Sequence, residues 1–220
     1  MPDLDPIPCT LDPPGRIAVI GAGPLGIETA LYGRFLGYDI QVYESRFIGS
    51  NLLSAEDSNL PLLPDRALSN LAVRALQTQN ETMPLTFPVT LHEWVENHLS
   101  QLAETDLLHG RVHVGCEVQS IEPCPVESDE EEVPPDFQLA ITNNSANAQE
   151  ETHECVIIAT GSDVNFKTPE IGVTPYLFRI GGTAHDNWED SFQAGLREIV
   201  NVFAELGGRS DLDLYRPKRI

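Results

Sequence analysis

The chain has 220 residues, of which 41% are hydrophobic, and a formal net charge of −21. Such an excess of negative charge disfavours binding to nucleic acids and to anionic membrane surfaces, because their phosphates would be repelled. No apolar run approaches the roughly 18 residues of a membrane span, so we expect a cytoplasmic protein.

The ends of the chain differ in composition from its middle. Residues 1–14 are acidic and proline-rich, and they lack the basic start and apolar stretch of a signal peptide. We therefore expect a flexible N-terminal segment over 1–14, a folded domain over 15–208 and a C-terminal tail over 209–220. The four cysteines show no C-x-x-C and no metal-ligand spacing, so no metal site is expected.

A glycine motif follows the first apolar run. Residues 17–20 are β-branched or small and apolar, which predicts a buried strand, and Gly21, Gly23 and Gly26 then complete G-x-G-x-x-G at the start of a helical pattern. Gly21 allows a tight turn, Gly23 lets a pyrophosphate approach the backbone, and Gly26 lets helix and strand pack closely. The helix N-terminus offers free N–H groups and a positive dipole end to the phosphates.

An acidic residue stands at the distance that a dinucleotide site requires. A second apolar strand, residues 40–43, ends in Glu44, which lies 18 residues after Gly26, close to the ~20 of the dinucleotide fingerprint. Its carboxylate can accept hydrogen bonds from ribose hydroxyls and would repel a 2′-phosphate. The pattern therefore favours FAD or NAD over NADP. Arg46 is a candidate neighbour of the phosphates or the adenine, with an ordinary surface arginine as the alternative.

The next segment mixes irregular chain with helices. Residues 45–65 form a long stretch with Gly and Pro, a length that is usually functional or disordered inside a domain. Helices are expected over 66–76 and, after a T-x-x-E capping box, over 90–104. Trp94 and Trp188 are expected to pack on apolar surface, and flavin stacking is the alternative for Trp188.

Strands dominate the following segment. Alternation predicts strands over 111–121 and 137–142, which flank an acidic run at 127–132, and the three-strand order suggests a small β-meander. A continuous apolar run at 155–158 suits a buried strand of a parallel sheet and ends in Ala159, Thr160 and Gly161.

One more strand and a helix close the pattern. A strand over 176–180 is followed by Gly181 and Gly182, and a helix with an apolar stripe spans 191–206. The predicted fold is α/β and Rossmann-like, with a central parallel sheet, helices on both of its faces and the β-meander.

Three of these segments, in this order, resemble the FAD-binding domain of two-dinucleotide-domain flavoproteins. They are the glycine fingerprint, the Ala-Thr-Gly strand and the closing strand–glycine–helix unit. The superfamily includes flavin-containing monooxygenases and pyridine-nucleotide–disulfide oxidoreductases. The resemblance implies FAD as cofactor and the following binding residues: Gly21, Gly23, Pro24, Leu25, Gly26, Glu44, Thr160 and Gly161, with Gly181 and Gly182 less firmly matched.

The chain departs from this superfamily in three ways. Its NAD(P)H domain lies between the Ala-Thr-Gly strand and the closing strand, where this chain has only residues 162–175, too few for a βαβ unit of ~30 residues. The redox cysteine pair of the disulfide reductases is absent. The closing segment of the disulfide reductases carries a Gly-Asp pair, whose carboxylate contacts the flavin ribityl chain. This chain has Gly181-Gly182 at that place. The loop after Glu44 would lie toward the flavin ring in such a fold.

These observations lead to a main functional hypothesis with two alternatives. The main one is an FAD-dependent oxidoreductase, similar to flavin monooxygenases, whose electrons come from free NAD(P)H or a partner reductase. The alternatives are a catalytically reduced FAD-binding module with a scaffolding or regulatory role, and a single-domain NAD-binding dehydrogenase. The sequence identifies neither the small-molecule substrate nor a catalytic residue, and His185 is better explained as a loop residue hydrogen-bonded to the backbone than as a general base. The partner could also be a second copy of this chain, so a homo-oligomer is a further alternative to a partner reductase.

Overall fold

A computed structural model describes residues 10–53, 59–79, 86–126, 133–145, 147–161, 165–183 and 186–216. Its centre is a five-stranded parallel sheet in the order β3-β2-β1-β7-β8. The strands are β1 (Arg16–Ile20), β2 (Asp39–Glu44), β3 (Val112–Val114), β7 (Cys155–Ile158) and β8 (Leu177–Arg179). Every residue of β7 is buried, as its continuous apolar run predicts for a central parallel strand.

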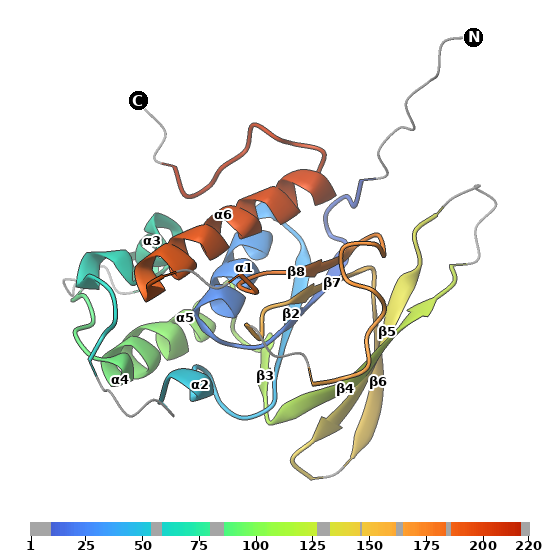
Figure 1. Cartoon of the computed structure of the whole chain (residues 1–220), viewed down its shortest axis with the longest axis horizontal. Coiled ribbons are helices and arrows are strands. Elements are labelled where there is room, and N and C mark those ends of the chain that lie inside the picture. Colours follow the sequence, from blue (N-terminus) through green and yellow to red (C-terminus); the bar gives the residue numbers. More distant parts are fainter. Residues whose placement is uncertain are drawn as a thin grey trace.

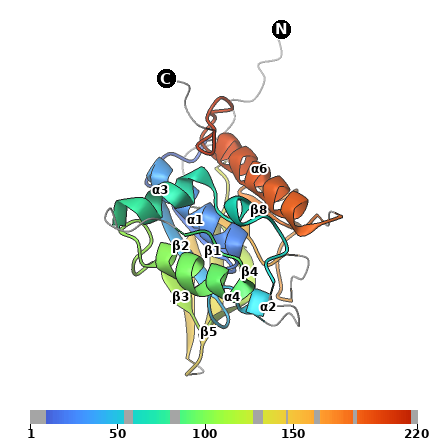
Figure 2. The same ribbon diagram turned by 90° about the vertical axis from the view of Figure 1, so that its left-hand side faces the viewer.

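Helices cover one face of this sheet. They are α1 (Pro24–Leu36), α3 (Asn70–Gln79), α6 (Trp188–Leu206) and a helical stretch composed of α4 (Leu91–Trp94), a π-helical turn at Val95–Leu99 and α5 (Ser100–Ala103). Their apolar side chains form one cluster with the sheet residues Ile17, Val19, Ile40 and Val42. Figures 1 and 2 show α1, α3 and α6 together on the side of the sheet away from β4–β6.

The other face is covered by the β-meander, so the expectation of helices on both faces is wrong for the described residues. Strands β4 (Cys116–Cys124), β5 (Asp136–Asn143) and β6 (Ala148–His153) form an antiparallel sheet in that order. Alternation along β4 and β5 gives this sheet one apolar face. That face packs on Ala18 and Ile20 of β1 and on Val156 and Ile158 of β7. A second layer of helices is not needed to bury the sheet.

The strand predicted over 111–121 is two strands that belong to different sheets. Gly115 separates them, and its φ of +68° is a conformation that favours glycine. Residues before it pair with β2 in the parallel sheet, whereas residues after it pair with β5 in the meander. The alternating pattern runs through Gly115 and therefore hides the change of sheet.

The helices also differ in detail from their predicted bounds. The helix expected over 66–76 is a 3₁₀ turn, Pro64–Arg66, followed by α3, and the stretch expected to be irregular over 45–65 contains a short helix α2 (Ser50–Leu53). The capping box is confirmed, since the Glu93 N–H donates to Thr90 Oγ1 at 3.1 Å. Helix α6 begins three residues earlier than expected, where Asn187 caps the Asp190 N–H at 2.8 Å.

Segments near both ends of the described chain lie on the domain. Leu11 is buried, and its N–H donates to the Leu206 carbonyl at 2.8 Å. Tyr215 packs on Tyr32 of α1 with ring centroids 5.1 Å apart. None of the described helices has both the length and the apolarity needed to cross a membrane. The predicted acidic run at 127–132 and His185 lie outside the described residues.

Candidate functional site

The glycine turn joins β1 to α1 by close backbone contacts. Gly21 has a φ of +103°, and its N–H donates to the Tyr43 carbonyl of β2 at 2.8 Å. A Cβ on Gly21 would stand 2.9 Å from the Ala159 carbonyl oxygen, and a Cβ on Gly26 would overlap the Gly21 carbonyl oxygen. Both glycines therefore allow backbone segments to approach, and neither lines the cavity described below.

Gly23 occupies a different environment. A Cβ on this residue would meet no atom within 4 Å, and its φ of −75° is open to any residue. The fold does not require glycine here, which leaves close approach by a ligand as the physical reason for it. Gly23 precedes the helix, and the first N–H of α1 with a backbone partner belongs to Ile27, at 3.0 Å from the Gly23 carbonyl. The Leu25 N–H is thus available to an anion at the helix N-terminus, whereas Gly26 is buried.

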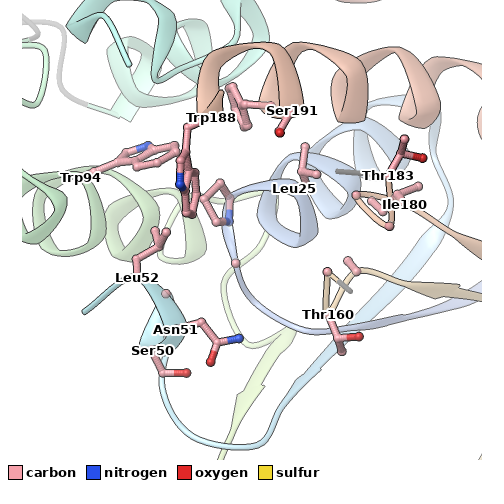
Figure 3. Close-up of a pocket in the computed structure, with 18 of the residues that line it drawn as sticks. Leu25, Ser50, Asn51, Leu52, Trp94, Thr160, Ile180, Thr183, Trp188 and Ser191 are labelled. Atoms are coloured by element: carbon pink, nitrogen blue, oxygen red, sulfur yellow. The ribbon is translucent and has the colours of Figure 1, made fainter. Parts of the chain in front are cut away.

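A cavity of about 470 Å³ opens at this helix N-terminus, beyond the carboxyl ends of β1 and β7. This is where open α/β sheets bind their ligands, and the volume is within the usual range for small-molecule sites. Among the residues predicted from the sequence, the structure brings the following to its wall: Gly23, Pro24, Leu25, Glu44, Thr160, Gly161, Gly181 and Gly182. Figure 3 shows Leu25, Thr160 and Ile180 around it.

Glu44 is buried at the end of β2, and its carboxylate already has several protein partners. Oε2 accepts from the Ala22 N–H at 2.9 Å, while Oε1 accepts from the Arg46 N–H at 2.9 Å and from Ser45 Oγ at 3.3 Å. A carboxylate has about four lone-pair sites, so roughly one is left for a ribose hydroxyl. Glu44 thus fixes the glycine turn and still faces the cavity.

Arg46 and Arg179 lie in different surroundings, and Arg46 fits the alternative of an ordinary surface arginine. Arg46 is exposed, its guanidinium bonds Asn51 Oδ1, and it does not line the cavity. Arg179, which the sequence analysis missed, lies behind two cavity loops: its Nη2 donates to the Gly161 carbonyl at 2.7 Å, and a Cβ on Gly182 would lie 2.8 Å from its Nε. Arg179 ends a short apolar strand, a position that carries no sequence signal for this contact.

The closing segment is fixed to the last helix. Gly181 has a φ of +66°, and its N–H donates to Glu198 Oε2 of α6 at 2.7 Å. No carboxylate stands at Gly182, but Asp186 lines the same cavity a few residues later. Among the described lining residues, Glu44 and Asp186 are the charged ones, so a bound phosphate would be neutralised by the N–H groups and dipole of α1 rather than by a lysine or arginine.

The opposite end of the cavity is aromatic. Trp94 of α4 and Trp188 and Phe192 of α6 line it, together with the α2 residues Ser50, Asn51 and Leu52. Helix α2 belongs to the loop after Glu44, so this loop does form part of the cavity wall. Trp94 and Phe192 meet edge to face with ring centroids 5.7 Å apart. Sequence analysis placed Trp94 on apolar surface and had no signal that α4 and α6 meet here.

The described residues hold no group of three or more His, Cys, Asp or Glu side chains suited to a metal ion. Cys155 is buried in β7, and burial raises the pKa of its thiol well above the usual value. A neutral, enclosed thiol is a poor nucleophile. The arrangement therefore offers a binding cavity with an anion-binding end and an aromatic end.

No family model matches the chain. A kynurenine 3-monooxygenase from Phaeosphaeria nodorum is 34% identical over 103 residues, which is 46% of this chain and 18% of that protein. The chain thus spans about a fifth of the length of the curated relative that it matches.

Solved structures give partial overlaps at low identity. A bacillithiol disulfide reductase from Bacillus cereus is 16% identical with a TM-score of 0.49, over 67% of this chain and 40% of that chain. OTEMO in complex with FAD and NADP is 18% identical with a TM-score of 0.48, over 74% of this chain and 28% of that chain. A steroid monooxygenase bound to NADP is 15% identical with a TM-score of 0.47, over 69% of this chain and 27% of that chain.

The strand order, the glycine turn and the sequence match to a monooxygenase point the same way. The parallel sheet and the glycine turn agree with the fold that the three motifs predict, and the sequence match is to a monooxygenase over 46% of this chain.

Proposed function

We propose that the chain binds FAD in the cavity at the N-terminus of α1 and is an FAD-dependent oxidoreductase similar to flavin monooxygenases. The observation that carries this proposal is Gly23, whose missing side chain leaves open space in front of unpartnered helix N–H groups. Nothing in the fold needs that space, whereas a pyrophosphate does.

The residues around the cavity fit the parts of FAD. The Leu25 N–H and the positive end of the α1 dipole would hold the pyrophosphate, and Glu44 would accept a hydrogen bond from the adenosine ribose. Trp94, Trp188 and Phe192 line the same cavity as Gly23 and Leu25. When bound, flavin supplies the electron chemistry, and the protein supplies binding, orientation and electrostatics. The monooxygenase that matches the sequence supports this assignment.

The source of electrons is the second part of the proposal. Between β7 and β8 the described chain forms no helix or strand, so no second nucleotide fold stands where the superfamily places it. We infer that electrons come from free NAD(P)H or from a partner protein. The alternative of a scaffolding module is equally consistent with the lack of a second nucleotide fold between β7 and β8. It differs in its prediction, which is that neither nicotinamides nor a reductase reduce the bound flavin at a useful rate.

Reduction of bound flavin tests the proposed activity. The protein loaded with FAD is mixed anaerobically with NADPH, with NADH, and with a photochemical donor as a positive control, and bleaching of the flavin band is followed. Reduction by a nicotinamide or by an added flavoprotein reductase, followed by reoxidation in air, supports the oxidoreductase. Reduction by light alone, with neither nicotinamides nor a reductase effective, favours the scaffolding module.

A further inference from the structure

Four large apolar side chains are exposed on segments that meet beside the cavity. Leu63, Phe87, Val89 and Trp188 are each between 43% and 59% exposed, and Trp188 also lines the cavity. We call these four residues the rim patch. Apolar residues scattered singly are ordinary on a protein surface, whereas exposed apolar residues that gather in one place and are bordered by polar groups mark a binding surface.

Hydrogen bonds join the segments that carry the rim patch. The Leu60 N–H donates to the Val89 carbonyl at 3.3 Å, which links the loop before the 3₁₀ turn to the chain that enters α4. The Leu63 N–H of the same loop donates to Glu189 Oε2 at 3.5 Å, in the first turn of α6 and next to Trp188. Figure 2 looks onto this side, with α2 and α4 facing the viewer and α6 beside them. The fold thus brings three segments that are far apart in the sequence to one surface.

Acidic side chains dominate the same three segments. Residues 59–66, 86–96 and 186–190 contain six carboxylates, one arginine and no lysine. None of these carboxylates is buried; they are Asp65, Glu93, Glu96, Asp186, Glu189 and Asp190. An apolar patch within an acidic surface is complementary to a partner whose docking face is apolar at its centre and basic around it.

The charge of the chain also discriminates between the candidate occupants. A second copy would bring another net charge of −21, and the same carboxylates, onto this surface, so like charges would meet across the interface. An anionic membrane surface would be repelled in the same way. A basic protein is attracted both at long range and at contact.

We propose that the rim patch is the docking surface for a redox protein with a basic, apolar-centred face, which passes electrons to the flavin in the adjoining cavity. This inference rests on the proposed function and names the electron source among the two that the function allows. Because Trp188 belongs to both the rim patch and the cavity wall, a partner seated on the patch lies next to the cavity. Between β7 and β8 the described chain forms no nucleotide fold that could deliver electrons instead.

Binding of ferricytochrome c, a small basic redox protein, tests the docking surface. Calorimetric titrations at low ionic strength use the full chain, with and without FAD, as wild type, Val89→Lys and Val173→Lys. The two valines are 59% and 69% exposed and neither lines the cavity, so the variants place the same charge change on different surfaces. We expect Val89→Lys to weaken binding about five- to tenfold, because the new lysine meets the basic face of the partner, and Val173→Lys to bind like wild type. Leu63→Ser, which removes apolar surface without changing the charge, should also weaken binding.

Electron transfer across the same surface is the second readout. Fully reduced flavin (FADH⁻), made by photoreduction of the FAD-loaded chain, gives one electron to each of two ferricytochrome c molecules, which leaves oxidised FAD and releases one proton. The second-order rate constant should fall for Val89→Lys by about the factor seen in binding, and it should be unchanged for Val173→Lys.

Each other outcome has a defined meaning. Equal binding by Val89→Lys and Val173→Lys overturns the proposal, because the attraction then belongs to the overall charge, and a wild type that does not bind ferricytochrome c overturns it as well. Self-association of wild type in sedimentation, abolished by Leu63→Ser, replaces the redox partner by a second copy. A wild type that binds no FAD removes the proposed function and the role in flavin reduction, while unequal binding by the two lysine variants still identifies the rim patch as a docking surface for a basic protein.

Discussion

Gly23→Val separates the requirements of the ligand from those of the fold. Gly23 has a backbone conformation open to any residue, and a Cβ there meets no protein atom within 4 Å. We therefore expect the free energy of unfolding to fall by no more than about 1 kcal/mol, the scale of replacing a favoured residue at a helix N-cap. The valine methyl groups would occupy the space in front of the α1 N–H groups. Dinucleotide affinity should fall at least about 100-fold, which corresponds to about 3 kcal/mol.

Gly26→Ala is the control for Gly23→Val, because the fold needs glycine at position 26 and does not need it at position 23. Its Cβ would overlap the Gly21 carbonyl oxygen, so α1 must move away from β1. We expect this variant to lose stability first and binding as a consequence. Urea unfolding and isothermal titration with FAD, made on both variants, check the pair. Retained FAD affinity in folded Gly23→Val would refute the reasoning, because the open space at Gly23 would then not belong to the ligand.

Three further predictions concern the ribose contact, a buried carboxyl and the electron donor. Glu44→Gln should weaken FAD by about 1–3 kcal/mol in titrations and leave FMN, which has no adenosine, nearly unaffected; equal losses would exclude the ribose contact. Burial raises the pKa of Glu28 from 4.5 to about 7, so the native state loses stability as pH rises from 4.5 to 7. Glu28→Gln should match wild type in urea unfolding near pH 4.5 and be about 3 kcal/mol more stable at pH 8, and a constant difference would contradict this. Flavin reduction in this chain should rise linearly with NADPH concentration, because its described residues form no second nucleotide fold between β7 and β8 to orient the nicotinamide; saturation at micromolar NADPH in stopped flow would show that some other surface does so.

The glycine turn was predictable because its chemistry is local. The three glycines stand close together in the sequence in a recognisable spacing, and the structure finds Gly21 and Gly26 in close backbone contacts and Gly23 at the cavity. Glu44 was predictable in position only. Its bonds to the Ala22 and Arg46 N–H groups depend on how β2 lies beside the turn.

Features that depend on packing between residues far apart in the sequence could not be predicted. Alternation along β4 and β5 shows that one face is apolar, but it does not say that this face covers the parallel sheet in place of helices. The capping box places Trp94 on a helix, yet its role at the cavity depends on α4 meeting α6, which lies about a hundred residues later in the chain. No local pattern encodes that meeting.

The most direct test of the central claim is reconstitution of the purified protein with FAD, FMN, NAD and NADP in parallel. After removal of free ligand, the visible spectrum is recorded, and the bound molecule is released and identified by mass. FAD retained at one per chain, with a flavin spectrum altered from that of free FAD, is the predicted result. Retention of NAD and not FAD at micromolar concentration would contradict the account.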